Sequence, residues 1–142
     1  MEPAKPSLIP PPFDDRALAL RVVSMPRDTN PNGTIFGGVI LSYIDQAGFV
    51  QARTHGCHRW VTASVDRVDF HAPVHLGDVV AFYTSTARLG TTSVKVSVEV
   101  DAERFGTGET VRVTEASITL VAIDADGKPI PFRTPATMTP PA

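Results

Sequence analysis

The stretch of sequence that decides the fold runs Gly37-Gly38-Val39-Ile40-Leu41-Ser42-Tyr43-Ile44-Asp45-Gln46-Ala47-Gly48-Phe49-Val50-Gln51-Ala52. It predicts a helix that is hydrophobic on nearly every face, and such a helix must be covered by other structure. Asp45 is the one carboxylate in this stretch. Burying an unpaired carboxylate costs free energy, and a protein tolerates that more readily where the carboxylate does chemistry. We therefore expect Asp45 to be a functional residue.

Segments with strand character surround this helix, and tight turns separate them. The clearest alternation lies in Thr92–Val100, where four valines share one face and polar residues occupy the other. Short connections require antiparallel neighbours. The predicted fold class is α+β, a curved antiparallel sheet around one long central helix, and an exposed helix flank would favour at least a dimer. The expected strands are Leu18–Ser24, Trp60–Phe70, Val79–Leu89, Thr92–Ala102 and Thr110–Ile123.

Proline placement marks the expected edges of the folded domain. Five of the 13 prolines fall in Met1–Pro12, and five more fall from Pro129 to the end. We therefore expect tails at residues 1–12 and 134–142, with one folded domain over residues 13–133.

Composition excludes several classes of partner. The net charge of −2 provides no basic field for nucleic acid or for an anionic membrane surface. No run of about 18 apolar residues is present, and Met1–Pro6 lacks the apolar core of a secretory signal. The single cysteine, Cys57, rules out an internal disulfide framework and fits a reducing compartment. We therefore expect a cytoplasmic protein without nucleic-acid or membrane partners.

Two further features point to chemistry at this helix. Gly37 and Gly38 begin it, where unpaired N–H groups at the positive end of the helix dipole can stabilise an oxyanion. Asn30 lies in the preceding loop and could orient a water molecule or a carbonyl group. Gly38 and Asp45 lie seven residues apart, or roughly 10 Å along the axis. Because a donor and a base must both lie about 3 Å from one reacting centre, we expect two antiparallel helices of a dimer to form a composite site.

The helix and the loop before it also resemble a known family. The segment Met25-Pro26-Arg27-Asp28-Thr29-Asn30-Pro31-Asn32-Gly33-Thr34-Ile35-Phe36-Gly37-Gly38, followed by Ile44-Asp45, resembles the signature of hotdog-fold acyl-CoA thioesterases. The chain looks most like bacterial short-chain acyl-CoA thioester hydrolases related to cytosolic and brain acyl-CoA hydrolase. Further matching segments are Phe70-His71-Ala72-Pro73-Val74 with Gly77-Asp78, Gly90-Thr91-Thr92-Ser93, and Thr114-Glu115-Ala116.

The resemblance implies a hotdog fold of five to six strands and assigns roles to several residues. It implies that Asp45 is the catalytic carboxylate, as general base or as nucleophile, and that Asn30 is the catalytic asparagine. It implies an oxyanion hole at the Gly37 or Gly38 amide. A coenzyme A channel would be lined by Gly90, Thr91, Thr92 and Ser93. The family's assembly is a dimer, commonly a trimer of dimers with sites between subunits, and its hydrolysis of acyl-CoA needs no metal or redox cofactor.

One departure from the family affects how coenzyme A is held. Related sequences carry Arg or Lys where this chain has Ala72 before Pro73. Another cation would then contact the nucleotide phosphates. Arg88, Lys95 and Arg59 are the candidates.

Alternative interpretations remain open on the sequence alone. Asp45 could be a structural acid paired with an arginine, Asn30 a turn residue, and Gly37-Gly38 a tight turn before close packing. His55-Gly56-Cys57-His58 offers metal ligands but lacks a second cluster to complete a site. The protein could also be a non-catalytic acyl-CoA sensor. A hotdog enoyl-CoA hydratase fits less well, because no histidine follows Asp45 before His55.

Overall fold

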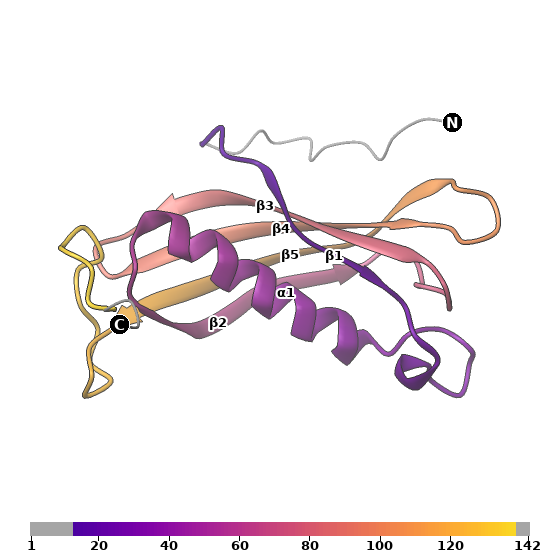
Figure 1. Cartoon of the computed structure of the whole chain (residues 1–142), viewed down its shortest axis with the longest axis horizontal. Coiled ribbons are helices and arrows are strands. Elements are labelled where there is room, and N and C mark those ends of the chain that lie inside the picture. Colours follow the sequence, from indigo (N-terminus) through magenta and orange to yellow (C-terminus); the bar gives the residue numbers. More distant parts are fainter. Residues whose placement is uncertain (1–12, 139–142) are drawn as a thin grey trace.

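The computed structural model describes residues 13–138, which form one curved antiparallel sheet with one long helix lying across its concave face (Figure 1). The predicted α+β architecture is confirmed, with five strands, and each expected strand is found within one residue of its predicted ends. The elements are β1 (Ala17–Val23), the 3-10 turn η1 (Pro26–Asp28), α1 (Gly37–Ala52), the 3-10 turn η2 (Arg53–His55), β2 (Arg59–Phe70), β3 (Val79–Leu89), β4 (Ser93–Glu103) and β5 (Thr110–Ile123).

The order of strands in the sheet is β1-β3-β4-β5-β2, and all neighbouring strands are antiparallel. The strands on either side of α1 in the sequence, β1 and β2, therefore form the two edges of the sheet. β2 is the longer edge, with 12 residues against seven in β1. Its outer row of backbone N–H and C=O groups has no partner strand within residues 13–138.

The core lies between α1 and the inner face of the sheet. The valines of β4 are buried as their alternation predicts, and they face a helix surface of small and branched residues. Gly48 allows the close approach of this surface to β5. A Cβ atom added there would lie 2.9 Å from Ile118 Cγ2 and 3.3 Å from Leu120 Cδ1. The helix therefore docks closely because position 48 has no side chain.

The single chain leaves one flank of α1 exposed, as the small size of the predicted sheet implies. Its buried residues lie on one side, whereas the opposite side leaves Phe49 40% and Val50 42% exposed beside Asp45 and Gln46. A five-stranded sheet can cover only one face of the helix. Within residues 13–138, no other element covers the second face.

The predicted domain ends are only partly within the described residues. The expected tail at residues 1–12 and the end of the other tail, residues 139–142, lie outside them. Within residues 134–138, the N–H groups of Thr137 and Met138 donate to the Cys57 carbonyl oxygen at 3.1 Å. None of the helices in residues 13–138 combines the length and apolar character needed to cross a bilayer.

The contact at Gly48 predicts that two glycines of the same helix respond oppositely to alanine. Gly48→Ala should lower the free energy of unfolding by about 1–3 kcal/mol, because the methyl group overpacks the contact with Ile118. Gly38→Ala is the matched control, since an added Cβ at position 38 meets nothing within 4 Å. That change should leave stability unchanged or slightly increased. Urea denaturation of both variants tests this prediction, and equal effects would contradict it.

Candidate active site

The carboxylate of Asp45 lies on the exposed side of α1, next to the edge strand β2. The Thr62 hydroxyl of β2 donates a short hydrogen bond to Asp45 Oδ1. No lysine or arginine within residues 13–138 forms an ion pair with Asp45. The interpretation of Asp45 as an acid paired with arginine therefore finds no support in the single chain.

Asp45 borders a groove between α1 and β2 with a volume of about 520 Å³. In the single chain this carboxylate is exposed, which leaves the expected burial of Asp45 to a second copy of the chain. The groove is apolar apart from the polar groups at its rim. Six of its lining residues are Asp45, Phe49, Val50, Trp60, Val61 and Thr62.

The N-terminus of α1 is open, as the glycine pair predicts. Gly37 and Gly38 are exposed, and the preceding residue, Phe36, makes no side-chain cap. Neither glycine N–H donates to the loop or to a side chain in the part of the chain that the structure describes. The first turn of α1 also contains no acidic residue. These N–H groups are therefore available to an oxygen atom that carries developing negative charge.

A cavity of about 360 Å³ opens next to this helix start. Gly37 forms part of its rim, and an added Cβ at Gly37 would lie 3.4 Å from the ring of Phe70. Most of the remaining wall is aliphatic and comes from α1 and the segment after β2. The helix start thus combines open N–H groups with an adjoining apolar cavity.

Asn30 holds the loop that leads into α1. Its Oδ1 atom accepts hydrogen bonds from the N–H groups of Asn32 at 2.9 Å and Thr34 at 3.1 Å, and its Nδ2 atom donates to Thr34 Oγ1 at 2.9 Å. This is the turn role considered from the sequence. An amide nitrogen carries two protons, so one N–H of Asn30 remains for another acceptor. A catalytic role for Asn30 stays a prediction.

The segment Gly90–Ser93, expected to contact coenzyme A, lies far from the start of α1 within one chain. It forms the turn between β3 and β4, at the end of the molecule where α1 ends (Figure 1). Gly90 and Thr91 also accept hydrogen bonds from Arg133 and Phe132. Because α1 is about 24 Å long, one chain does not bring this segment to Gly37.

The three cations proposed for the phosphates of coenzyme A differ in their surroundings. Arg88 and Arg59 are exposed and form no ion pair within residues 13–138. Lys95 Nζ lies 3.8 Å from Asp66 Oδ2. Arg88 lies two residues before Gly90, so of the three it is closest in sequence to the expected channel.

The histidines of His55-Gly56-Cys57-His58 have structural partners. His55 Nε2 lies 2.7 Å from Thr86 Oγ1, and the ring nitrogens of His58 lie 2.9 Å from Thr137 Oγ1 and 2.8 Å from the Phe132 carbonyl oxygen. Across residues 13–138, no group of three or more His, Cys, Asp and Glu side chains is arranged to hold a metal ion. Both histidines connect the end of α1 to other segments.

Thr62 is the functional candidate that sequence reasoning missed. A threonine on a strand is ordinarily a good strand former, so nothing in the sequence distinguishes this one. Its contact with Asp45 joins two separate elements, β2 and α1, and Thr62 lies beside a register irregularity of β2 between Thr62 and Ser64. Only the folded arrangement shows that the two side chains meet.

Comparison with known proteins places these features in a family context. The family model of the thioesterase superfamily matches residues 32–109, which include Gly37, Gly38 and Asp45. Acyl-CoA thioester hydrolase YciA of Salmonella typhimurium is 41% identical over 118 residues, which cover 81% of this chain and 89% of the relative.

Solved structures similar to this chain also come from thioesterases and acyl-CoA hydrolases. A hexameric hotdog fold thioesterase of Campylobacter jejuni superposes with a TM-score of 0.77 at 45% identity, covering 81% of this chain and 89% of that protein. An acyl-CoA hydrolase of Staphylococcus aureus, solved with butyryl coenzyme A, coenzyme A and coenzyme A disulfide, superposes with a TM-score of 0.74. It is 30% identical over 85% of this chain and 72% of its own.

The surroundings of His55 predict how stability depends on pH. Burial lowers the pKa of His55 from its ordinary value of 6.5, Asp15 opposes this shift, and Arg133 adds to it. The unfolded chain then binds a proton more readily than the folded one, so His55 favours folding fully above pH 6.5 and progressively less as pH falls below that value. The melting temperature should fall between pH 7 and pH 5, and His55→Gln should reduce that fall. Identical pH profiles for both proteins would contradict this.

Proposed function

The chain belongs to the thioesterase superfamily and is an acyl-CoA thioester hydrolase, and we propose that two copies of it build each active site together. The observation that carries this proposal is the position of Asp45. Its carboxylate is oriented by Thr62, borders an apolar groove, and lies two helical turns from the open N–H groups of Gly37 and Gly38. The hotdog fold holds the Asp45 carboxylate and these N–H groups on the same helix.

In the proposed mechanism the thioester carbonyl oxygen lies against the Gly37 or Gly38 N–H of one copy. These donors stabilise the negative charge that grows on the oxygen as the carbonyl carbon is attacked. Asp45 of the other copy supplies the second function, either by removing a proton from the attacking water or by attacking the carbon directly. If water attacks, the C–S bond breaks, the thiolate of coenzyme A takes up the proton, and the acyl group is released as a carboxylate. If Asp45 attacks, the thiolate leaves a mixed anhydride between Asp45 and the acyl group, and water then hydrolyses this anhydride to the free carboxylate and Asp45.

The exposed edge strand β2 supports the composite site, because it offers a surface along which two copies would pair. β2 is a long edge strand with an unpaired backbone row, and Val61 and Val65 on it are 42% and 47% exposed. The neighbouring helix face adds Phe49 and Val50. Antiparallel pairing of two β2 strands would extend the sheet and bury these side chains together with Asp45. The second face of α1 would then be covered by the partner's helix.

The same pairing would account for the distant Gly90–Ser93 segment. In an antiparallel pair, the end of one α1 lies beside the start of the other. Gly90–Ser93 lies beside the C-terminal end of α1 in its own chain (Figure 1). It would therefore approach the N-terminal end of the partner's α1, where the partner's glycine pair lies. We propose that this segment lines the coenzyme A channel and that Arg88 provides a cation for the phosphates.

The remaining parts of the proposal concern cofactors, assembly and location. Thioester hydrolysis requires water, a base and an oxyanion hole, so we propose that no metal or redox cofactor takes part. The protein acts as a homo-oligomer, and the hexameric state of the Campylobacter jejuni relative supports a trimer of dimers. We also propose a cytoplasmic location, which the single cysteine supports because it fits a reducing compartment.

Asp45→Asn tests the central chemical role. The amide has nearly the same shape, yet it neither removes a proton nor attacks the thioester effectively. The kcat for butyryl-CoA, followed by thiol release, should fall by about a thousandfold while the protein keeps its oligomeric state. A folded variant with near-normal kcat would contradict the mechanism.

The same assay separates the enzyme from the alternative of a non-catalytic sensor. A sensor would bind butyryl-CoA, as calorimetry would show, without releasing thiol. Failure of the wild-type protein to turn over any acyl-CoA from acetyl to palmitoyl would favour the sensor.

Thr62→Val tests whether Thr62 positions the carboxylate. Valine has the shape of threonine but donates no hydrogen bond, so Asp45 would lose its orienting partner. We expect kcat to fall by about tenfold with KM little changed, because Thr62 acts through Asp45 and not on the substrate. Thr62→Ser keeps the donor and should restore most of kcat. Equal losses in the valine and serine variants would mean that shape, and not the hydrogen bond, matters.

A further inference from the structure

Two buried side-chain atoms within residues 13–138 have no hydrogen-bond partner, and one of them belongs to a residue that lines the cavity beside the start of α1. The atoms are Arg112 Nη2 and Thr114 Oγ1. Thr114 is 1% exposed and lies in the wall of the 360 Å³ cavity next to Gly37. A buried hydroxyl without a partner loses free energy relative to water, so such a group calls for an explanation.

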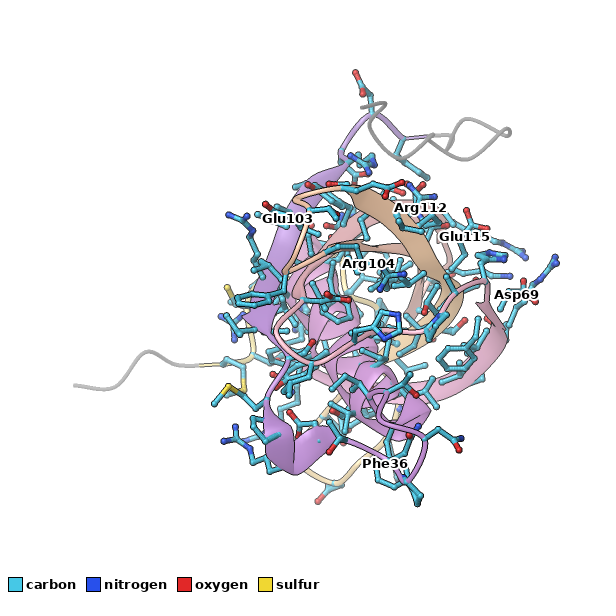
Figure 2. The ribbon with its side chains drawn as sticks, turned by 90° about the vertical axis from the view of Figure 1, so that its right-hand side faces the viewer. Phe36, Asp69, Glu103, Arg104, Arg112 and Glu115 are labelled. Carbon is cyan, nitrogen blue, oxygen red and sulfur yellow. The ribbon has the colours of Figure 1, made fainter. Side chains whose placement is uncertain are left out.

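The unpaired Nη2 atom of Arg112 belongs to a guanidinium group whose other nitrogens contact three carboxylates. Its guanidinium donates to Asp101 at 2.5 Å and to Glu115 at 3.0 Å, and it pairs with Glu99 at 2.7 Å. Figure 2 shows Arg112 and Glu115 together near one edge of the view, away from Phe36 at the start of α1. The cluster lies on the outer face of the sheet and compensates the charge of Arg112.

Within the described residues, the side chain of Thr114 has no comparable set of polar contacts. It lies on β5, opposite Phe70 of β2 and Val100 of β4 in the sheet register, and Val100 is completely buried. Its side chain therefore belongs to the inner face of the sheet, toward α1. The cavity wall around it is mainly aliphatic and aromatic, with residues Ile35, Ile40, Phe70, Ala72 and Val74.

The other polar groups of the cavity are already committed. The His71 ring lies 3.2 Å from Glu115 Oε2. The N–H groups of His71 and Ala72 both donate to the Val113 carbonyl oxygen. The Gly37 N–H faces the thioester oxygen in the proposed function. The second ring nitrogen of His71 belongs to an exposed side chain, so the Thr114 hydroxyl is the buried polar side-chain group of this wall that has no partner within the described residues.

We propose that the acyl group of the substrate enters this cavity and that Thr114 hydrogen-bonds an oxygen on the acyl chain. The inference rests on the proposed function, because the Gly37 rim orients the acyl group into the cavity. An unsubstituted chain would displace water from Thr114 and leave its hydroxyl unpaired. A hydroxyacyl or oxoacyl chain would restore the hydrogen bond. The enzyme therefore prefers short acyl-CoA thioesters that carry such an oxygen.

The physical basis is the asymmetry of buried hydrogen bonds. A site that hydrogen-bonds a substrate hydroxyl discriminates strongly against the analogue without it, because the protein group is then left unpaired. Size alone discriminates weakly between butyryl and hydroxybutyryl chains. Thr114 is therefore the residue that would set this preference.

The test compares butyryl-CoA with 3-hydroxybutyryl-CoA, 4-hydroxybutyryl-CoA and acetoacetyl-CoA in the oligomeric enzyme. We expect at least one oxygenated substrate to exceed butyryl-CoA in kcat/KM by about tenfold. In Thr114→Val, kcat/KM should fall for that substrate and rise for butyryl-CoA, which lowers their ratio at least tenfold. Thr114→Ser keeps a hydroxyl and should retain the preference.

Each outcome has a defined meaning. If the ratio of kcat/KM between the oxygenated substrate and butyryl-CoA is the same in wild type and Thr114→Val, the proposal is overturned. Thr114 is then an ordinary strand residue. The same holds if no oxygenated substrate exceeds butyryl-CoA. Loss of turnover on every acyl-CoA by the wild-type enzyme would instead contradict the proposed function itself. If Thr114→Val fails to fold, loss of the preference in Thr114→Ala would support the proposal, and its persistence would overturn it.

Discussion

The rigid spacing between Gly38 and Asp45 on one helix is the constraint on which the structure and its function depend. Seven residues of α-helix separate them by roughly 10 Å along the axis, and both lie on the exposed face of α1. The oxyanion donor and the base must nevertheless reach one carbonyl carbon. Both groups belong to one continuous helix, Gly37–Ala52, so their spacing is set by helix geometry. A second, antiparallel helix from another copy of the chain would bring its Asp45 to the glycine pair of the first helix.

The rest of the fold fits this requirement. The strand order leaves β2 as a long edge, next to the exposed side of α1, and exposed valines follow that edge. Thr62, which orients Asp45, lies on the same strand. The surface that would associate two copies therefore also carries the carboxylate that we propose to be catalytic. In the proposed pair, one surface would serve both assembly and activity, because the carboxylate would be shielded from water only when two copies meet.

Much of this could be predicted from the sequence because the relevant signals are local. The alternation of valines in β4 predicts the inner face of the sheet, and Gly37-Gly38 followed by an apolar run predicts where α1 begins. The resemblance to hotdog-fold acyl-CoA thioesterases was right about family and fold. What covers the second face of α1 could not be predicted in this way, because sequence periodicity shows that a helix face is apolar without showing which structure covers it.

Other features depend on contacts between distant segments, which no local pattern contains. The hydrogen bond between Thr62 and Asp45 joins β2 to α1, two elements whose relative placement is set by the whole fold. The unpaired hydroxyl of Thr114 arises because β5 places it against a cavity wall that the segment after β2 completes. The loop role of Asn30 was considered beforehand, yet only the structure shows its three hydrogen bonds.

The most direct measurement of the shared site is complementation between two inactive variants. One chain carries Asp45→Asn. The other carries whichever of Gly37→Pro and Gly38→Pro abolishes turnover alone, since proline in the first helical turn removes an N–H that has no helical partner. After random re-association of equal amounts, a composite site predicts about a quarter of the wild-type activity, because half of the pairs are mixed and each contains one intact site. A mixture no more active than the two pure variants would contradict the shared site.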